Sequence, residues 1–70
     1  MPTTAEVKFP DAFVQLSGED GNAGSIMGRV TRELKKAGAS DEEISAFRAE
    51  CISGDYDELL RTVMRWVETA

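Results

Sequence analysis

The sequence predicts an α+β fold that is mostly helical, with an N-terminal β-strand or short hairpin followed by a three-helix bundle. Three observations predict it. Apolar residues recur at helical spacing in segments 23–37, 41–52 and 56–68. Glycine-containing turns separate these segments. Segment 7–17 instead alternates with a period of two. Seventy residues form a single small domain, residues 1–70.

The first 17 residues contain the expected extended segment. Residues 1–6 are small and polar, and we expect them to be disordered. Pro10 has no N–H to donate, so it splits the segment or marks an edge, and the best strand lies near residues 12–17. A lone strand needs a partner. Either residues 6–9 fold back on it as a hairpin, or the same strand of a second copy pairs with it in a homodimer.

The first predicted helix begins after a turn at residues 18–21, and either Asp20 or Asn22 caps it. Gly24 and Gly28 are unusual inside a helix, because each costs about 1 kcal/mol relative to alanine. They allow either a tight crossing against another element or a notch for a partner. The expected apolar stripe consists of Ala23, Ile26, Met27, Val30, Leu34 and Ala37.

The second and third helices carry clear start signals. Ser40 and Glu43 form a capping-box pattern, and Asp55 and Glu58 form another. In the second helix, the expected core residues are Ile44, Phe47 and Cys51. In the third helix, they are Tyr56, Leu59, Leu60, Val63, Met64 and Val67. Trp66 lies beside this last stripe, where it either widens the core or forms an exposed anchor for a partner.

Composition excludes several kinds of site. The net charge is −5, which disfavours nucleic-acid binding driven by phosphate neutralisation. A single cysteine excludes an internal disulfide, and the lack of histidine disfavours a structural zinc site. No apolar run reaches membrane-spanning length, so we expect no membrane association. A lone cysteine and a start without signal-peptide features are typical of a cytoplasmic protein.

No catalytic constellation emerges from the residue pattern. The glycines near the first helix lack the order of a phosphate-binding loop, and Glu19 and Asp20 would repel a phosphate. The same loop lacks the ligand spacing of a calcium site. Cys51 has no histidine base and lies on an apolar stripe. We therefore predict no enzyme activity, no catalytic or metal-binding residues and no cofactor.

A basic stripe supports an alternative function. Arg29, Arg32 and Lys36 fall on one face of the first helix at spacings of three and four. The stripe is either a solvated helix face or the contact surface of an accessory nucleic-acid-binding protein. The second and third helices could imitate a helix-turn-helix, but Asp55, Asp57 and Glu58 crowd the start of the third helix and disfavour base readout.

Two blocks carry a resemblance: VQLSGEDGNAGSIMGRV at residues 14–30 and SGDYDELLRTVMRWV at residues 53–67. With the intervening AGASDEEISAF, they resemble a group of small uncharacterised bacterial and phage or plasmid proteins that have a GEDGNA-like loop and a closing GDYDxLL helix. The resemblance implies a cytoplasmic, mobile-element setting and no mechanism. Gly24 stands where those proteins carry an aromatic residue, which implies a lost core contact here.

The predicted function is a small, non-enzymatic cytoplasmic interaction protein that binds an unidentified protein partner or itself. The expected contact residues are Glu19, Asp20, Asn22 and Trp66. The basic stripe carries the nucleic-acid alternative. A third idea is an acidic decoy of nucleic acid, which requires the acidic residues at 41–43 and 55–58 to form one continuous surface.

Overall fold

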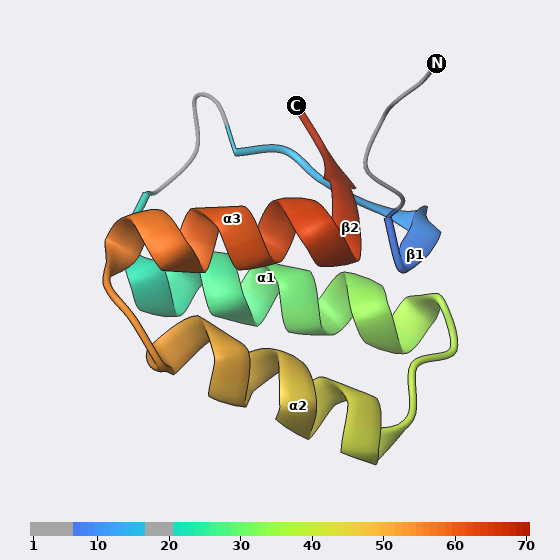
Figure 1. Ribbon diagram of the computed structural model, residues 1–70. Helices are drawn as coiled ribbons and strands as arrows, with labels where there is room; N and C mark the ends of the chain where they lie inside the picture. Colours follow the sequence, from blue (N-terminus) through green and yellow to red (C-terminus); the bar gives the residue numbers. More distant parts are fainter. Residues whose placement is uncertain (1–6, 17–20) are drawn as a thin grey trace.

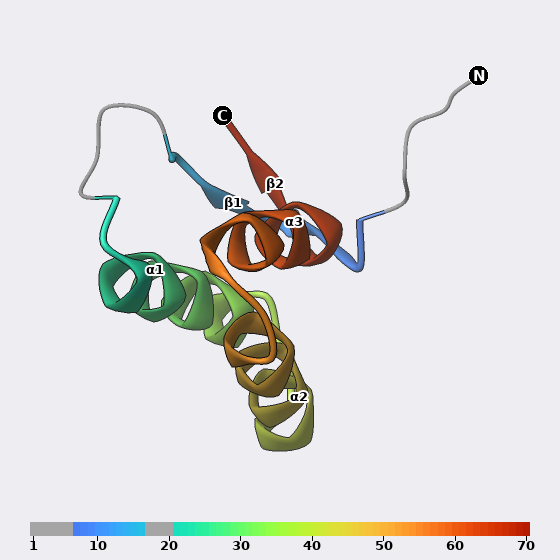
Figure 2. The same ribbon diagram turned by 60° about the vertical axis from the view of Figure 1, so that its left-hand side comes forward.

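The computed structural model describes residues 7–16 and 21–70, and these form two strands and three helices (Figure 1). The elements follow in the order β1 (Phe9–Val14), α1 (Ala23–Lys36), α2 (Asp41–Ile52), α3 (Tyr56–Trp66) and β2 (Val67–Thr69). The predicted mostly helical α+β class is confirmed. The sheet and α2 lie on opposite sides of α1 and α3 (Figure 2). α1 and α3 also pack against the sheet. The three-helix bundle stays a prediction.

The sheet joins the two ends of the chain. β1 pairs with β2 in parallel, with Phe9 opposite Val67, Phe13 opposite Glu68 and Val14 opposite Thr69. Between the first two pairs, β1 contains three additional residues (10–12), whereas Val67 and Glu68 of β2 are consecutive. This irregularity in β1 is a bulge. Pro10 lies in this bulge, where a missing N–H breaks no ladder hydrogen bond. Pro10 thus interrupts the pairing, as the sequence predicted.

The partner of β1 differs from both alternatives that the sequence offered. The hairpin through residues 6–9 is wrong, because Phe9 belongs to β1 itself and β2 supplies the partner. Pairing with a second copy is not needed to satisfy β1, although a homodimer through its other edge stays a prediction. The strand also begins and ends earlier than the expected residues 12–17.

α3 ends two residues before the predicted boundary at residue 68. Val67 is extended, with φ −137° and ψ 163°, and its side chain is 1% exposed. Lys8 N donates to Arg65 O at 3.1 Å, which satisfies one carbonyl of the last helical turn. Long-range pairing with β1 therefore competes with continued helix at Val67, a β-branched residue that suits both a strand and a core.

One apolar core lies between the sheet and the helices. β1 alternates as predicted, with Ala12 and Val14 buried and Phe13 exposed. The stripe of α2 is confirmed residue by residue. In α3, the buried face is rotated from the prediction, because Tyr56 and Met64 are exposed. The buried apolar residues are Ala12, Val14, Ile26, Val30, Leu34, Ile44, Phe47, Cys51, Leu59, Val63, Trp66 and Val67.

All three helices have a side-chain N-cap. Asn22, not Asp20, has the observed cap role for α1, and its Oδ1 accepts from Gly24 N at 2.9 Å and Ser25 N at 3.4 Å. The capping box at α2 is complete: Glu43 N donates to Ser40 Oγ at 3.1 Å, and Ser40 N donates to Glu43 Oε1 at 2.8 Å.

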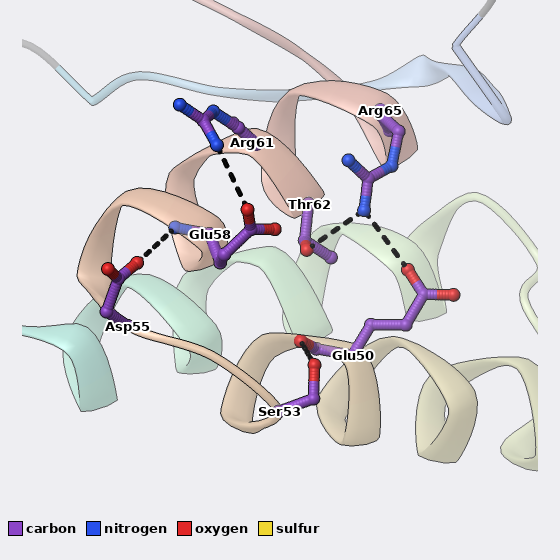
Figure 3. Close-up of polar contacts among 7 residues, drawn as sticks. All are labelled: Glu50, Ser53, Asp55, Glu58, Arg61, Thr62 and Arg65. Carbon is purple, nitrogen blue, oxygen red and sulfur yellow. Dashed lines mark hydrogen bonds and ion pairs between the residues drawn. The ribbon is translucent and has the colours of Figure 1, made fainter.

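Only half of the predicted capping box is seen at α3. Asp55 Oδ1 accepts from Glu58 N at 3.0 Å, while Glu58 Oε2 accepts from Arg61 at 3.0 Å (Figure 3). The helix therefore keeps its N-cap, and the carboxylate of Glu58 makes an ion pair one turn along the helix instead.

No other helix or strand of the described residues closely approaches the glycines of α1. A Cβ placed on Gly28 would have no atom within 4 Å, and one on Gly24 would meet only the capping oxygen of Asn22, at 3.2 Å. The expected close approach of another element is therefore wrong. The alternative, a notch for a partner, stays a prediction.

Candidate functional site

Trp66 is a core residue, so the expectation that it forms an exposed contact is wrong. Its side chain is 2% exposed. Phe9 stacks on it with ring centroids 6.0 Å apart, and Phe47 meets it edge-on at 5.5 Å. Lys8 Nζ lies 4.5 Å from the ring centroid and covers it from outside. Trp66 therefore joins β1, α2 and α3, as its alternative reading as a core residue predicted.

The polar edge of Trp66 is satisfied inside the protein. Its Nε1 donates to Glu50 Oε1 at 3.0 Å. Arg65 Nη2 lies 3.8 Å from the same oxygen and donates to Thr62 Oγ1 at 3.2 Å (Figure 3). The contacts to Glu50 connect α3 to α2, and the indole N–H already has a hydrogen-bond acceptor within the protein. Trp66, Glu50, Arg65 and Thr62 therefore form a structural polar cluster between the two helices.

Two of the four predicted partner-binding residues, Asn22 and Trp66, lie within the described ranges. Asn22 is exposed at the start of α1, but its side chain caps that helix. Trp66 is the last residue of α3, and its side chain is buried. Glu19 and Asp20 lie outside the described residues. No common surface of Asn22 and Trp66 exists to carry the predicted contact.

The predicted acidic decoy surface is not continuous. The residues at 41–43 start α2 and those at 55–58 start α3, and these two helix starts lie at opposite ends of the molecule (Figure 1). A mimic of nucleic acid would need a continuous row of negative charge. This alternative is therefore wrong.

The basic stripe of α1 has three different environments. Lys36 Nζ lies 3.5 Å from Glu33 Oε2. Arg29 is half-buried, whereas Arg32 is exposed. Arg29 and Arg32 both line an open groove of about 150 Å³ between β1 and α1, which we call the β1–α1 groove. Its lining consists of Phe13, Val14, Gln15, Arg29, Arg32 and Glu33.

Phe13 is the most apolar exposed residue of this groove, and the predicted site did not include it. It is 51% exposed on the outer side of β1, opposite the buried Ala12 and Val14. The signal was present in the sequence, because the alternation placed Phe13 on the same face as the polar Gln15. On this side of the strand the ring has no core to fill, and it lies in the groove together with Arg29 and Arg32.

A second groove lies where α1, α2 and α3 meet. It has a volume of about 250 Å³ and a mostly apolar lining, which includes Met27, Cys51 and the 73% exposed Ile52. Burial, then the neighbouring Glu50 carboxylate, raise the pKa of the Cys51 thiol to about 11, while Arg48 acts in the opposite direction. At neutral pH the thiol is protonated, so it is a poor nucleophile.

Neither a metal-ligand cluster nor a membrane-spanning helix is found among the described residues. Within residues 7–16 and 21–70, no three acidic, cysteine or histidine side chains gather as possible metal ligands. None of the helices in these ranges is long and apolar enough to cross a membrane. Comparisons of the chain with family models, curated proteins and solved structures find no match. The resemblance to phage and plasmid proteins therefore stays a prediction.

Proposed function

We propose that this protein is a small, non-enzymatic interaction protein that binds a protein partner through the β1–α1 groove. One observation carries the proposal: Phe13 is 51% exposed on an edge strand and lies in the same groove as Arg29 and Arg32. Phenylalanine and arginine are both enriched in protein–protein interfaces relative to the rest of the surface. The groove replaces the contact residues expected from the sequence, which were Glu19, Asp20, Asn22 and Trp66, as the proposed contact surface.

The groove suits a macromolecule better than a small substrate. Its volume is about 150 Å³ and it is open to solvent, whereas ligand pockets usually enclose about 300–1,000 Å³. A cytoplasmic location and a mobile-element origin belong to this proposal as well. They rest on the single cysteine and on the sequence resemblance, respectively.

The proposal is tested by affinity capture from a lysate of the organism that encodes the chain, with nuclease treatment. Wild-type protein is compared with Phe13→Ser and with Met64→Ser, a matched change at a 48% exposed residue of α3. We expect wild type and Met64→Ser to capture the same discrete protein, and nuclease treatment not to release it. Phe13→Ser should fail to capture it. Equal capture by all three proteins would contradict the assignment of the groove.

The nucleic-acid alternative has one observation in its favour. Phe13 beside two arginines could also stack a base in a positively charged groove, as single-strand binders do. The net charge of −5 opposes it. This alternative predicts that a labelled single-stranded oligonucleotide binds at low salt and that affinity falls steeply as salt increases. Absence of binding at about 50 mM salt would eliminate it.

A further inference from the structure

The backbone of β1 has one edge that β2 does not use. Ala70 N donates to Val14 O at 3.4 Å, and Leu16 N donates to Ala70 O at 2.8 Å. The polar groups of Val14 and Leu16 therefore point toward the β2 side. Successive residues of a strand point their backbone groups to opposite edges, so the N–H and C=O of Phe13 point away from β2. The described residues place no third strand there.

This unused edge at Phe13 borders the β1–α1 groove, and the opposite wall belongs to α1, the most basic of the described helices and strands. α1 contains Arg29, Arg32, Lys35 and Lys36 and one acid, Glu33, in a chain whose net charge is −5. The carboxylate of Glu33 is paired with Lys36. Arg32 is exposed and makes no hydrogen bond or ion pair with any residue of the described ranges. The groove thus combines strand-edge backbone groups, an apolar ring and positive charge.

We propose that β1 accepts an extended, acidic peptide segment of a partner protein as a third strand of the sheet. Backbone hydrogen bonds at Phe13 supply register, as in other cases of strand addition to a sheet edge. An apolar side chain of the peptide packs on Phe13, and an acidic one faces Arg32. This inference rests on the proposed function and specifies the class of its partner.

Two other occupants of the groove fit the observations less well. A second copy pairing edge to edge would bring its own α1, with four basic residues, beside the first, and like charges would oppose the contact. A nucleic-acid strand has no row of amide donors and carbonyl acceptors to complement a sheet edge. A peptide uses both the backbone edge and the charge.

The test starts from a displayed library of random linear peptides selected on the immobilised 70-residue protein. We expect the enriched peptides to alternate β-branched or aromatic residues with other residues and to contain Asp or Glu. Phe13→Ser and Arg32→Glu should each weaken binding of a synthetic enriched peptide at least about tenfold. The matched controls are Met64→Ser and Arg48→Glu, which alter exposed residues outside the groove and should change affinity less than about twofold.

A backbone scan of the same peptide distinguishes strand addition from other modes. N-methylation at alternate positions removes donors that face β1 and should weaken binding about tenfold or more, whereas methylation at the intervening positions should have little effect. Circular dichroism spectra of the protein variants verify that they are folded. Affinity with this alternating pattern, and with the expected losses at Phe13 and Arg32, would support the inference.

Several results would overturn it. Enriched peptides that bind as helices, or that ignore N-methylation and Arg32→Glu, would exclude strand addition but leave the proposed function intact. Failure to enrich any peptide, with a labelled single-stranded oligonucleotide binding instead and losing affinity in Phe13→Ser, would contradict both proposals. A concentration-dependent dimer that Phe13→Ser dissociates would assign the edge to self-pairing.

Discussion

Trp66 connects more of the structure than any other single side chain described above. It contacts a ring of β1 and a ring of α2, donates a hydrogen bond to Glu50 and is covered by Lys8. Its place next to an apolar stripe allowed either a core or a surface role. The choice depended on Phe9 and Phe47, which are remote in sequence, and local spacing does not specify such neighbours.

Replacing Trp66 by alanine is expected to abolish the cooperative fold. Large-to-small changes of buried aromatic residues cost about 3–5 kcal/mol. A single core of this size supplies about the same free energy of unfolding. Urea denaturation followed by circular dichroism measures the effect, with Met64→Ala, at an exposed position of the same helix, as the control. A cooperative transition in Trp66→Ala close to that of wild type would show that the ring cluster contributes little.

The buried thiol of Cys51 should make the free energy of unfolding depend on pH in the alkaline range. Its thiol has a pKa of about 11 in the folded chain and 9.0 as its ordinary value. Between these values the unfolded chain has lost the proton that the folded chain still holds, so the free energy of unfolding falls as pH rises from 9 to 11. Below pH 9 this contribution is fully present.

The measurement for Cys51 is urea denaturation at pH 8, 9, 10 and 11 for wild type and Cys51→Ala. Wild type should lose more stability across this range, since other titrating groups are common to both proteins. Parallel curves for the two proteins would mean that the thiol ionises equally in the folded and unfolded states.

At the scale of the element, the accuracy of a sequence-based prediction depended on how local the determining contacts are. The bounds of α2 match the prediction because Ser40 and Glu43 lie within one turn of each other and Ile44, Phe47 and Cys51 repeat along one helix. The predicted end of α3 at residue 68 is wrong because Val67 is not helical and pairs instead with Phe9 of β1, which is remote in sequence. The groove is absent from the sequence-based prediction for the same reason, since Phe13 and Arg32 come to line one groove only through the packing of β1 on α1.

Two glycine substitutions in and after α1 should have opposite effects. Gly28→Ala fills open space in a helix and should raise the free energy of unfolding by about 0.5–1 kcal/mol. Gly38, which ends the turn after α1, has φ +93°, so Gly38→Ala should lower it by roughly 1 kcal/mol. Thermal melts of both variants measure the difference. A destabilised Gly28→Ala protein would indicate a contact at that helix face, and intact partner binding by the same variant would remove the notch alternative.

At the scale of the whole molecule, the short β2 connects the chain ends and completes the core. Val67 is buried, the β2 backbone pairs with β1, and Ala70 hydrogen-bonds to Val14 and Leu16. A chain that ends at Trp66 loses all of these contacts together. Each lost interaction is modest, but a domain of this size has little stability in reserve.

We therefore expect the chain truncated after Trp66 to lose its cooperative urea transition, while Glu68→Lys keeps it. Glu68 lies in the same strand, but its side chain is exposed, so this variant preserves both the backbone ladder and the buried Val67. The unpaired β1 of the truncated chain should also promote association at high concentration, because both of its edges are then open. Sedimentation of the truncated chain measures this association. A monomeric truncated chain with a transition like that of wild type would mean that the helices alone hold the fold and that β1 needs no partner within the chain.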